Sequence, residues 1–262
     1  MLGFESLDRQ QLLDSLVPVA RMAGAQIMEV YAKDPEADFK GDGSPVTEAD
    51  QAAEAIILPA LQQLAPGIAI VSEENAASHA LQAPELFFLV DPLDGTKEFL
   101  KRDGKGAFTV NIALIHQGEP VLGVVYAPAL DRLFTGIVGT GAQEIQADVT
   151  RDIRIRPVPV QGAVAVASAS HRDADTDAWL QAQGIEQTVS IGSSLKFCLV
   201  AAGEADVYPR FGPTMEWDTG AGDAVLRAAG GQVTLPDTTA FRYGKPDYRN
   251  PAFIAWGGFP AS

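Results

Sequence analysis

The first third of the chain carries apolar side chains at helical spacing. Residues 7–31 place them at every third or fourth position: Leu13, Leu16, Val17, Ala20, Ala23, Ile27 and Val30. That period predicts an amphipathic helix, which Pro18 is expected to kink or break. A loop rich in turn-forming residues follows at 40–45, and a second helix is predicted from about residue 47 to residue 64, with Pro59 as an irregularity.

The pattern then changes to short apolar runs, which predict strands at residues 68–72, 86–90, 108–115, 121–126 and 133–138. Residues 86–90 are apolar without interruption, as in a strand buried on both faces. The turn-forming segment 116–120 joins two of these runs as a hairpin.

Strands and helices alternate in the second half of the chain. Strands are predicted at 163–167, 188–191, 206–208 and 253–256, and helices at 175–183, 194–202 and 218–229. Together with the hairpins of the first half, this order predicts a layered α+β fold. The proline-containing segment 148–161 is the expected boundary between two lobes, residues 1–155 and residues 156–262.

Composition narrows the class of protein. Hydrophobic residues make up 47% and charged residues 20% of the 262 positions, which excludes a disordered chain or a coiled coil. The net charge of −15 repels nucleic acid and anionic lipid, so we expect no nucleic acid polymer as a partner. A phosphorylated substrate would therefore need positive charge supplied locally.

The chain has one cysteine, Cys198, so it has no intrachain disulfide and no zinc site built on several cysteines. Cys198 is expected to be a buried small apolar residue. No basic start followed by an apolar block is present, and no apolar run reaches about 18 residues. We expect a cytoplasmic protein without stable membrane insertion, a monomer or a homodimer; peripheral association with the inner membrane stays open.

The segment 89–99 carries the most informative chemistry. Asp91 and Asp94 follow a buried strand, with a rigid proline between them and Gly95 after them. Two carboxylates that converge repel each other unless one is protonated or a cation lies between them, and near neutral pH a hard divalent cation with oxygen ligands is the natural solution. Gly95, Thr96 and Lys97 then offer backbone N–H groups, a hydroxyl and an ammonium to a phosphate. The alternative is an ordinary surface turn.

Other acidic residues allow two interpretations each. Glu73 and Glu74 close another apolar strand, where one could face a metal, although such pairs are usually solvated. Asp218 stands at the start of a predicted helix and could be its cap. Asp50 fits the acidic position of a capping box. A cluster of basic residues follows the Asp91 motif and is either a positive patch or a mixed solvated loop: Lys97, Lys101, Arg102 and Lys105.

Three blocks make the chain resemble the lithium-sensitive, magnesium-dependent phosphatases of the inositol monophosphatase superfamily. They are Ser-Glu-Glu at 72–74, Asp-Pro-Leu-Asp-Gly-Thr at 91–96 and Trp-Asp-Thr-Gly-Ala-Gly-Asp at 217–223. Within it, the chain resembles 3′(2′),5′-bisphosphate nucleotidases of the CysQ type. That likeness rests on Lys-Glu-Phe at 97–99, Phe-Thr-Val-Asn-Ile-Ala-Leu at 108–114, Gly-Ser-Ser-Leu-Lys-Phe-Cys at 192–198 and the segment 208–218.

The resemblance implies an α-β-α-β-α sandwich of the sugar phosphatase type. It also implies magnesium-dependent hydrolysis of the 3′-phosphate of 3′-phosphoadenosine 5′-phosphate, as in sulfur assimilation, with 3′-phosphoadenosine 5′-phosphosulfate as a second candidate substrate. Two or three magnesium ions are expected, and lithium is expected to inhibit. The metal ligands that it implies are Glu73, Asp91, the carbonyl of Leu93, Asp94 and Asp218.

The remaining roles follow from the same resemblance. Thr96, hydrogen-bonded to Asp50, would orient and help to deprotonate the attacking water. The residues expected to contact substrate are Gly95, Thr96, Lys97, His171, Ser193, Lys196, Arg210 and Asp218. His171 could equally be a surface loop residue.

Alternatives stay open at this point. The same metal core would serve an inositol monophosphatase or a fructose 1,6-bisphosphatase, although segments 192–198 and 208–215 favour a nucleotide. A non-catalytic sensor of metal and nucleotide is a second class, disfavoured by the full carboxylate set. A calcium-buffering protein is disfavoured because no EF-hand spacing is present.

Overall fold

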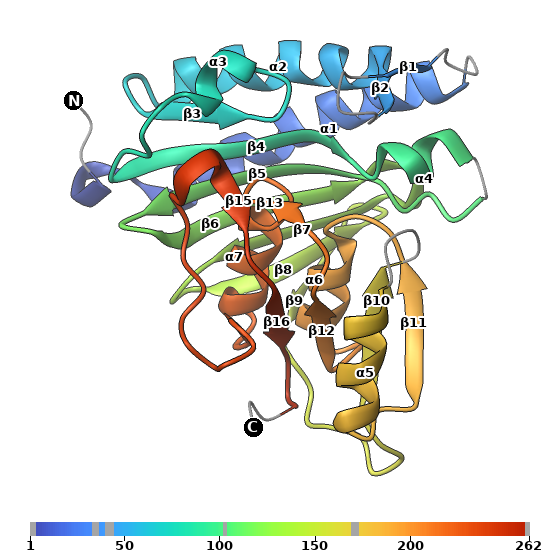
Figure 1. The fold of residues 1–262 in the computed structure, drawn as a ribbon. Coiled ribbons are helices and arrows are strands. Elements are labelled where there is room, and N and C mark those ends of the chain that lie inside the picture. The colour runs from blue at the N-terminus through green and yellow to red at the C-terminus, as the bar shows by residue number, and fades with distance from the viewer. Residues whose placement is uncertain (1–3, 33–36, 40–44, 102–103, 169–172, 260–262) are drawn as a thin grey trace.

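The structure is a computed structural model that describes residues 4–32, 37–39, 45–101, 104–168 and 173–259. Helices α1 (Arg9–Ala32) and α2 (Glu48–Leu64) cover one face of a seven-stranded sheet (Figure 1). Helices α6 (Leu195–Ala201) and α7 (Gly220–Ala228) lie between this sheet and a five-stranded sheet, whose far face packs on α5 (Ala174–Ala182). The predicted α-β-α-β-α order of layers is confirmed.

The seven-stranded sheet follows the chain order. Its strands are β3 (Ala69–Ser72), β4 (Leu86–Asp94), β5 (Thr109–His116), β6 (Glu119–Ala127), β7 (Arg132–Ile137), β8 (Gly141–Gln146) and β9 (Val149–Ile153). The first pair is parallel and the others are antiparallel, so the predicted hairpin of β5 and β6 is confirmed.

The five-stranded sheet has the order β11-β10-β12-β16-β14. Its strands are β10 (Val164–Ser168), β11 (Gln187–Ile191), β12 (Val207–Arg210), β14 (Gln232–Thr234) and β16 (Phe253–Trp256). Two small pairs complete the strands: β1 (Ala37–Phe39) with β2 (Pro45–Thr47), and β13 (Thr214–Met215) with β15 (Arg249–Asn250). The short helices are α3 (Ala76–His79), α4 (Thr96–Lys101), η1 (Phe4–Ser6), η2 (Pro128–Leu130) and η3 (Pro246–Tyr248).

Strand β4 separates two apolar cores, which explains its uninterrupted apolar run. Phe88 and Val90 pack toward α1 and α2, whereas Phe87 and Leu89 belong to the core around α6 and α7. Successive side chains of a strand point to opposite faces, so both sets must be apolar here. The strand that carries Asp91 is therefore held firmly from both sides.

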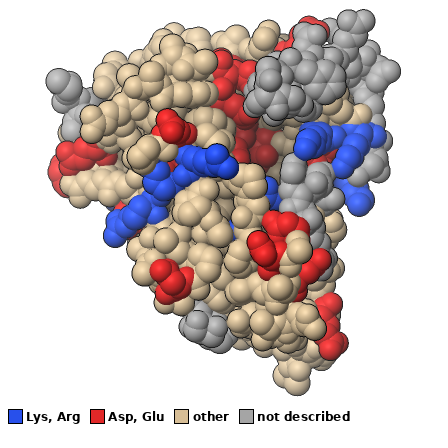
Figure 2. Space-filling view, in the orientation of Figure 1, with Lys and Arg blue, Asp and Glu red and all other residues tan. Residues whose placement is uncertain are grey.

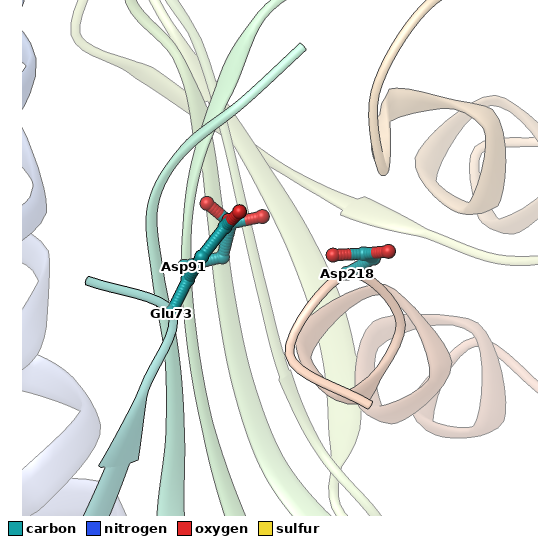
Figure 3. A group of neighbouring side chains, drawn as sticks. All are labelled: Glu73, Asp91 and Asp218. Carbon is teal, nitrogen blue, oxygen red and sulfur yellow. The ribbon is translucent and has the colours of Figure 1, made fainter. Parts of the chain in front are cut away.

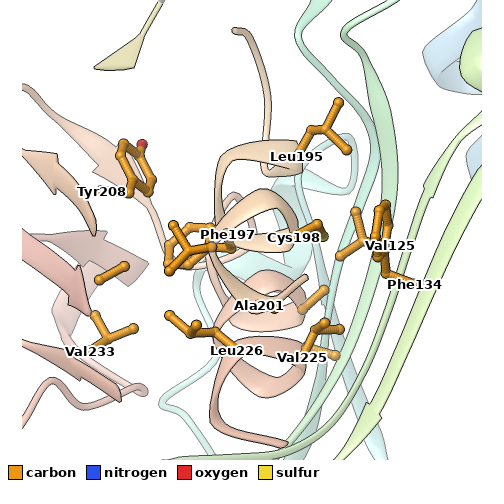
Figure 4. Close-up of a cluster of buried hydrophobic side chains, with 14 of the residues drawn as sticks. Val125, Phe134, Leu195, Phe197, Cys198, Ala201, Tyr208, Val225, Leu226 and Val233 are labelled. Atoms are coloured by element: carbon orange, nitrogen blue, oxygen red, sulfur yellow. The ribbon is translucent and has the colours of Figure 1, made fainter. Parts of the chain in front are cut away.

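Helix α7 packs very closely on the seven-stranded sheet. A Cβ added at Gly123 of β6 would lie 2.3 Å from the carbonyl oxygen of Ala221, so only glycine allows this approach. Figure 4 shows the apolar side chains between the two sheets, with Cys198 among them. Cys198 is fully buried, as predicted, and burial raises the pKa of its thiol.

Several predicted boundaries differ from the structure. Helix α1 runs without a break through Pro18, and α2 through Pro59, since the buried face of each helix is packed against the sheet. Strand β9 lies inside the segment expected as a lobe boundary; its first four residues are exposed, so it lacks the alternation that marks a strand. The division into two lobes stays a prediction, and residues 40–44 of the predicted loop lie outside the described residues. None of the described helices is long and apolar enough to cross a membrane.

Candidate active site

Two carboxylates lie near the carboxyl ends of neighbouring strands of the seven-stranded sheet. Strands β3 and β4 are parallel, with Ser72 opposite Val90. Glu73 directly follows β3, and Asp91 directly follows Val90 within β4. The backbone N–H of Glu73 donates to the carbonyl of Val90 at 3.1 Å. Figure 3 shows the two side chains directed to the same side. The parallel register therefore brings together residues from two separate motifs.

Asp91 is almost completely buried, with 1% of its surface exposed. Its Oδ1 accepts a hydrogen bond from the backbone N–H of Leu93 at 3.1 Å. Its Oδ2 is buried and has no hydrogen-bond partner within the described part of the chain. Such an orphaned carboxylate oxygen is costly unless a cation or a proton satisfies it.

Asp218 approaches this pair from the segment before α7 (Figure 3). Helix α7 begins at Gly220 with Thr219 as its N-cap residue, so Asp218 is not the helix cap. Its Oδ2 accepts a hydrogen bond from the backbone N–H of Met215 at 2.8 Å. Glu73, Asp91 and Asp218 each offer an oxygen, and these oxygens all lie within 4.8 Å of one another.

The electrostatics of this group fit a divalent cation. Burial, and then the neighbouring charges, raise the pKa values of Asp91 and Asp218 well above the ordinary range of a carboxyl. For Asp91 the strongest neighbouring charge is that of Glu73; for Asp218 it is that of Asp94. A hard cation with oxygen ligands removes this repulsion and satisfies the free oxygen of Asp91. The three carboxylates are a candidate metal site.

Asp94, also predicted as a metal ligand, lies beside this group with one oxygen engaged. Its Oδ2 accepts a hydrogen bond from the backbone N–H of Ser194 at 2.5 Å. Burial raises the pKa of Asp94 to about 6, against the lowering effect of the Lys196 ammonium. The other predicted ligand on this strand, the carbonyl of Leu93, accepts a hydrogen bond from Thr96 Oγ1 at 3.3 Å.

The turn after Asp94 depends on Gly95. Its φ of +91° lies in the region that favours glycine, and an added Cβ would lie 3.0 Å from the carbonyl oxygen of Ala107. Thr96 then begins α4. Asp50 is buried at the start of α2, near enough for its charge to raise the pKa of Asp91. The hydrogen bond between Thr96 and Asp50 stays a prediction.

Lys196 places a cation near the carboxylates. It lies on α6 with 5% of its surface exposed, and its Nζ donates to the carbonyl of Ser193 at 2.5 Å. The Nζ also lies 5.3 Å from the centre of the Tyr208 ring. Burial lowers the pKa of Lys196 to about 8, although the nearby carboxylate of Asp94 raises it. The site thus holds a cation that is nearly out of contact with water.

Arg210 provides a second cation in the lining of the same cavity. It is the last residue of β12, with 7% of its surface exposed. Its guanidinium donates to the carbonyls of Gly212 at 3.2 Å and Pro213 at 3.0 Å. A guanidinium carries five N–H donors, so this anchoring leaves others for a ligand.

These carboxylates and cations line one cavity of about 300 Å³. Among its lining residues are these predicted site residues: Glu73, Asp91, Leu93, Asp94, Gly95, Thr96, Lys97, Ser193, Lys196, Arg210 and Asp218. Asp50 does not line it, and His171 lies outside the described residues. In Figure 2 acidic side chains gather in a recess, with basic side chains on either side.

Sequence reasoning missed several residues of this cavity. Ser194 and Tyr208 line it, and the backbone N–H of Ser194 holds Asp94. Both lie in the motif segments 192–198 and 208–218, within which the family resemblance points to Ser193 and Arg210. Glu98 and Thr219 also line the cavity, and each directly follows a predicted site residue.

The fold and the carboxylate group are those of a known family of phosphatases. The model of the inositol monophosphatase family matches residues 8–257, so the chain belongs to the inositol monophosphatase family. Among solved structures, the fold is similar to CysQ from Bacteroides thetaiotaomicron, with a TM-score of 0.84 and 38% identity over 96% of this chain and 98% of that one. An inositol monophosphatase from Anabaena has a TM-score of 0.73 and 28% identity over 96% and 92% of the two chains.

Curated relatives point to one branch of the family. The chain is 49% identical to the 3′(2′),5′-bisphosphate nucleotidase CysQ of Escherichia coli O157:H7, over 85% of this chain and 89% of that protein. It is 50% identical to the protein of the same name from Salmonella typhimurium, over the same shares of the two chains. The resemblance drawn from the sequence motifs is therefore confirmed.

Proposed function

We propose that this chain is a 3′(2′),5′-bisphosphate nucleotidase that hydrolyses the 3′-phosphate of 3′-phosphoadenosine 5′-phosphate. One observation carries the proposal: a single cavity is lined both by the acidic group Glu73, Asp91 and Asp218 and by the buried cations Lys196 and Arg210. A substrate with two phosphates matches this division, because one phosphate can lie at a metal site while the other meets fixed positive charge.

Magnesium suits the acidic group of the cavity, whose donors are all oxygen atoms. One ion would be held by Glu73, Asp91 and the carbonyl of Leu93, and a second by Asp91, Asp94 and Asp218. Bound divalent ions lower the pKa of an attacking water and stabilise the leaving oxygen. The second ion requires Asp94 to exchange its contact with Ser194 for the metal, or to use its other oxygen.

The chain's own residues would orient the reactants. Thr96 and Asp50 would position the attacking water and take up its proton. The backbone N–H groups of Gly95 and Thr96 would hold the phosphate oxygens. A bond forms between the water oxygen and phosphorus, the bond from phosphorus to the 3′ oxygen breaks, and the 3′ oxygen takes up a proton.

The second phosphate and the nucleoside need contacts of their own. Lys196, Arg210 and Ser193 line the cavity, and so does Lys97, whose side chain is exposed. His171 is a further expected contact. The phosphosulfate analogue carries its sulfate on the same 5′ group, so 3′-phosphoadenosine 5′-phosphosulfate is a second proposed substrate.

The test is phosphate release with Mg²⁺ from both nucleotides, inositol 1-phosphate and fructose 1,6-bisphosphate, each with and without Li⁺. We expect release from the nucleotides that Li⁺ inhibits, and no release by an Asp91→Asn variant. Preference for inositol phosphate or the sugar bisphosphate would keep the metal site and reject the nucleotide. Nucleotide binding without release from any substrate would identify a sensor.

A further inference from the structure

Asn250 lies behind the segment that carries Asp218. Strands β13 and β15 pair antiparallel, with Thr214 opposite Asn250. Asn250 has 5% of its surface exposed, and it does not line the cavity. It belongs to none of the motifs recognised in the sequence.

The side-chain amide of Asn250 reaches three acceptors in the segment before α7. Its Nδ2 lies 2.7 Å from the carbonyl oxygen of Met215 and 3.1 Å from the hydroxyl oxygens of Thr214 and Thr219. A carbonyl oxygen only accepts hydrogen bonds, so the nitrogen of the amide must face Met215. The Oδ1 atom has no partner within the described part of the chain, so the hydrogen bonding of this side chain runs through Nδ2.

Met215 passes this constraint on to Asp218. The backbone N–H of Met215 donates to Asp218 Oδ2 at 2.8 Å, and its carbonyl accepts from the backbone N–H of Asp218 at 3.2 Å. Asn250 therefore holds the same carbonyl that closes the turn of Asp218. The other two acceptors, Thr214 and Thr219, both line the cavity.

Such a constraint matters because the carboxylates repel one another. Asp218 lies within reach of Glu73 and Asp91, and a free turn would let it move away from them. A metal site binds more tightly when its ligands are held in place before the ion arrives. Asn250, which does not line the cavity, hydrogen-bonds the turn that carries Asp218 and so restricts its movement.

We propose that Asn250 is a positioning residue for divalent metal binding, which acts by fixing the Met215 carbonyl and through it the Asp218 carboxylate. The inference rests on the metal site of the proposed function. It makes no assumption about which phosphate ester the chain hydrolyses, so it can be tested without any substrate.

The test is calorimetric titration of the full chain with Mg²⁺. Asn250→Asp keeps the shape of the side chain but removes the donor, and Asn250→Ala removes the whole amide. We expect both to lower Mg²⁺ affinity by about 10–100-fold, the usual effect of losing a group that orients a metal ligand. Thr234→Val is the matched control, because it removes a buried hydrogen bond of 2.9 Å to Trp256 Nε1 away from the cavity. It should keep the affinity of the wild type.

A double-mutant cycle separates positioning from a general loss of structure. In an Asp218→Asn background, where Glu73, Asp91 and Leu93 still offer a site, Asn250→Asp should change Mg²⁺ affinity by less than about twofold. Equal losses in both backgrounds, or wild-type affinity in Asn250→Asp, would overturn the proposal. Should Asn250→Ala fail to fold, as judged by circular dichroism, the Asp variant decides. A wild-type chain that binds no Mg²⁺ would overturn the proposed function as well.

Discussion

The imidazole ring of His79 stacks on the indole ring of Trp217, with 4.6 Å between the ring centres and 21° between their planes. His79 Nε2 also lies 2.8 Å from the carbonyl oxygen of Ser72, to which it can only donate. Ser72 precedes Glu73, and Trp217 precedes Asp218. The side chain of His79 therefore joins the two segments that bring Glu73 and Asp218 to the candidate metal site.

We predict that His79→Ala weakens both the fold and metal binding. Loss of the stack and of the hydrogen bond together should lower the free energy of unfolding by about 1–3 kcal/mol. His79→Phe keeps the stack and should recover part of that loss. Urea unfolding measures the stability, and calorimetric titration measures Mg²⁺ affinity. An Ala variant as stable as the wild type would show that the stack contributes nothing.

We predict that Asp94→Asn lowers kcat by several orders of magnitude and leaves the fold intact. The amide can still accept from Ser194 through its oxygen, but it loses the negative charge that a metal requires. Steady-state kinetics at saturating Mg²⁺ measure kcat, and circular dichroism reports the fold. Turnover close to that of the wild type would contradict the assignment of Asp94 as a metal ligand.

We predict that Lys196→Ala and Lys196→Met weaken binding of the bisphosphate nucleotide more than they impair hydrolysis of p-nitrophenyl phosphate. A lost bond between a cation and a phosphate corresponds to a KM increase of roughly 10–100-fold. The Met variant keeps the buried apolar stem, so it isolates the charge. Equal losses on both substrates would show that Lys196 does not select the nucleotide.

The pKa of Lys196 adds a pH dependence to that prediction. Burial lowers this pKa to about 8, so the ammonium loses its proton, and with it the attraction for phosphate, as the pH rises above that value. The KM for the nucleotide should rise there in the wild type and stay flatter in Lys196→Met. Parallel pH profiles of the two proteins would assign the effect to another group.

We predict that the free energy of unfolding of the metal-free protein falls as the pH rises. Burial raises the pKa of Asp94 from 3.8 to about 6, and Asp91 and Asp218 also have raised pKa values. These groups keep their protons in the folded chain after the unfolded chain has lost them. The metal-free protein should therefore lose stability as the pH rises from about 4 to beyond 6.

Mg²⁺ needs the ionised carboxylates, so its stabilising effect should grow over the same range. Differential scanning calorimetry from about pH 5 to about pH 8, in Mg²⁺ and in EDTA, measures the difference in Tm. The matched control is Glu73→Gln, for which the difference should shrink at every pH. A constant difference across the range would contradict a site built from carboxylates of raised pKa.

The local pattern of hydrophobic and polar residues predicted most of the helices and strands. Residues 86–90 were recognised as a doubly buried strand because apolar side chains on both faces leave an uninterrupted run, and β4 has that environment. The sequence does not predict β8 because its two buried positions hold Ala142 and Glu144, so burial alternates there without a matching alternation of hydrophobic residues. It does not predict β9 because the first four residues of that strand are exposed. Pro18 did not end α1, because packing of the helix on the sheet outweighs the one hydrogen bond that a proline lacks.

Local motifs likewise indicated some residues of the site, whereas tertiary contacts alone placed others. The Asp91 motif predicts a metal-binding turn from its own residues. The residues around Asp218 also fit a helix cap, and only the family resemblance implies a metal ligand there. The structure brings an oxygen of Asp218 within 4.8 Å of oxygens of Glu73 and Asp91. Asn250 carried no signal at all, since an isolated asparagine before a proline is common in turns. Its role depends on the pairing of β13 with β15, which no local pattern encodes.

The sequence by itself determined the class of fold, the family and the identity of the acidic residues, because periodicity and motif spacing are properties of short stretches of chain. Only the tertiary structure decided which carboxylate oxygens converge, that Asp94 lies against Ser194, and that Lys196 is buried in the same cavity as these carboxylates. Those distances depend on how distant segments pack around two sheets. The energies of burial and repulsion that set the pKa values exist only once that packing has formed.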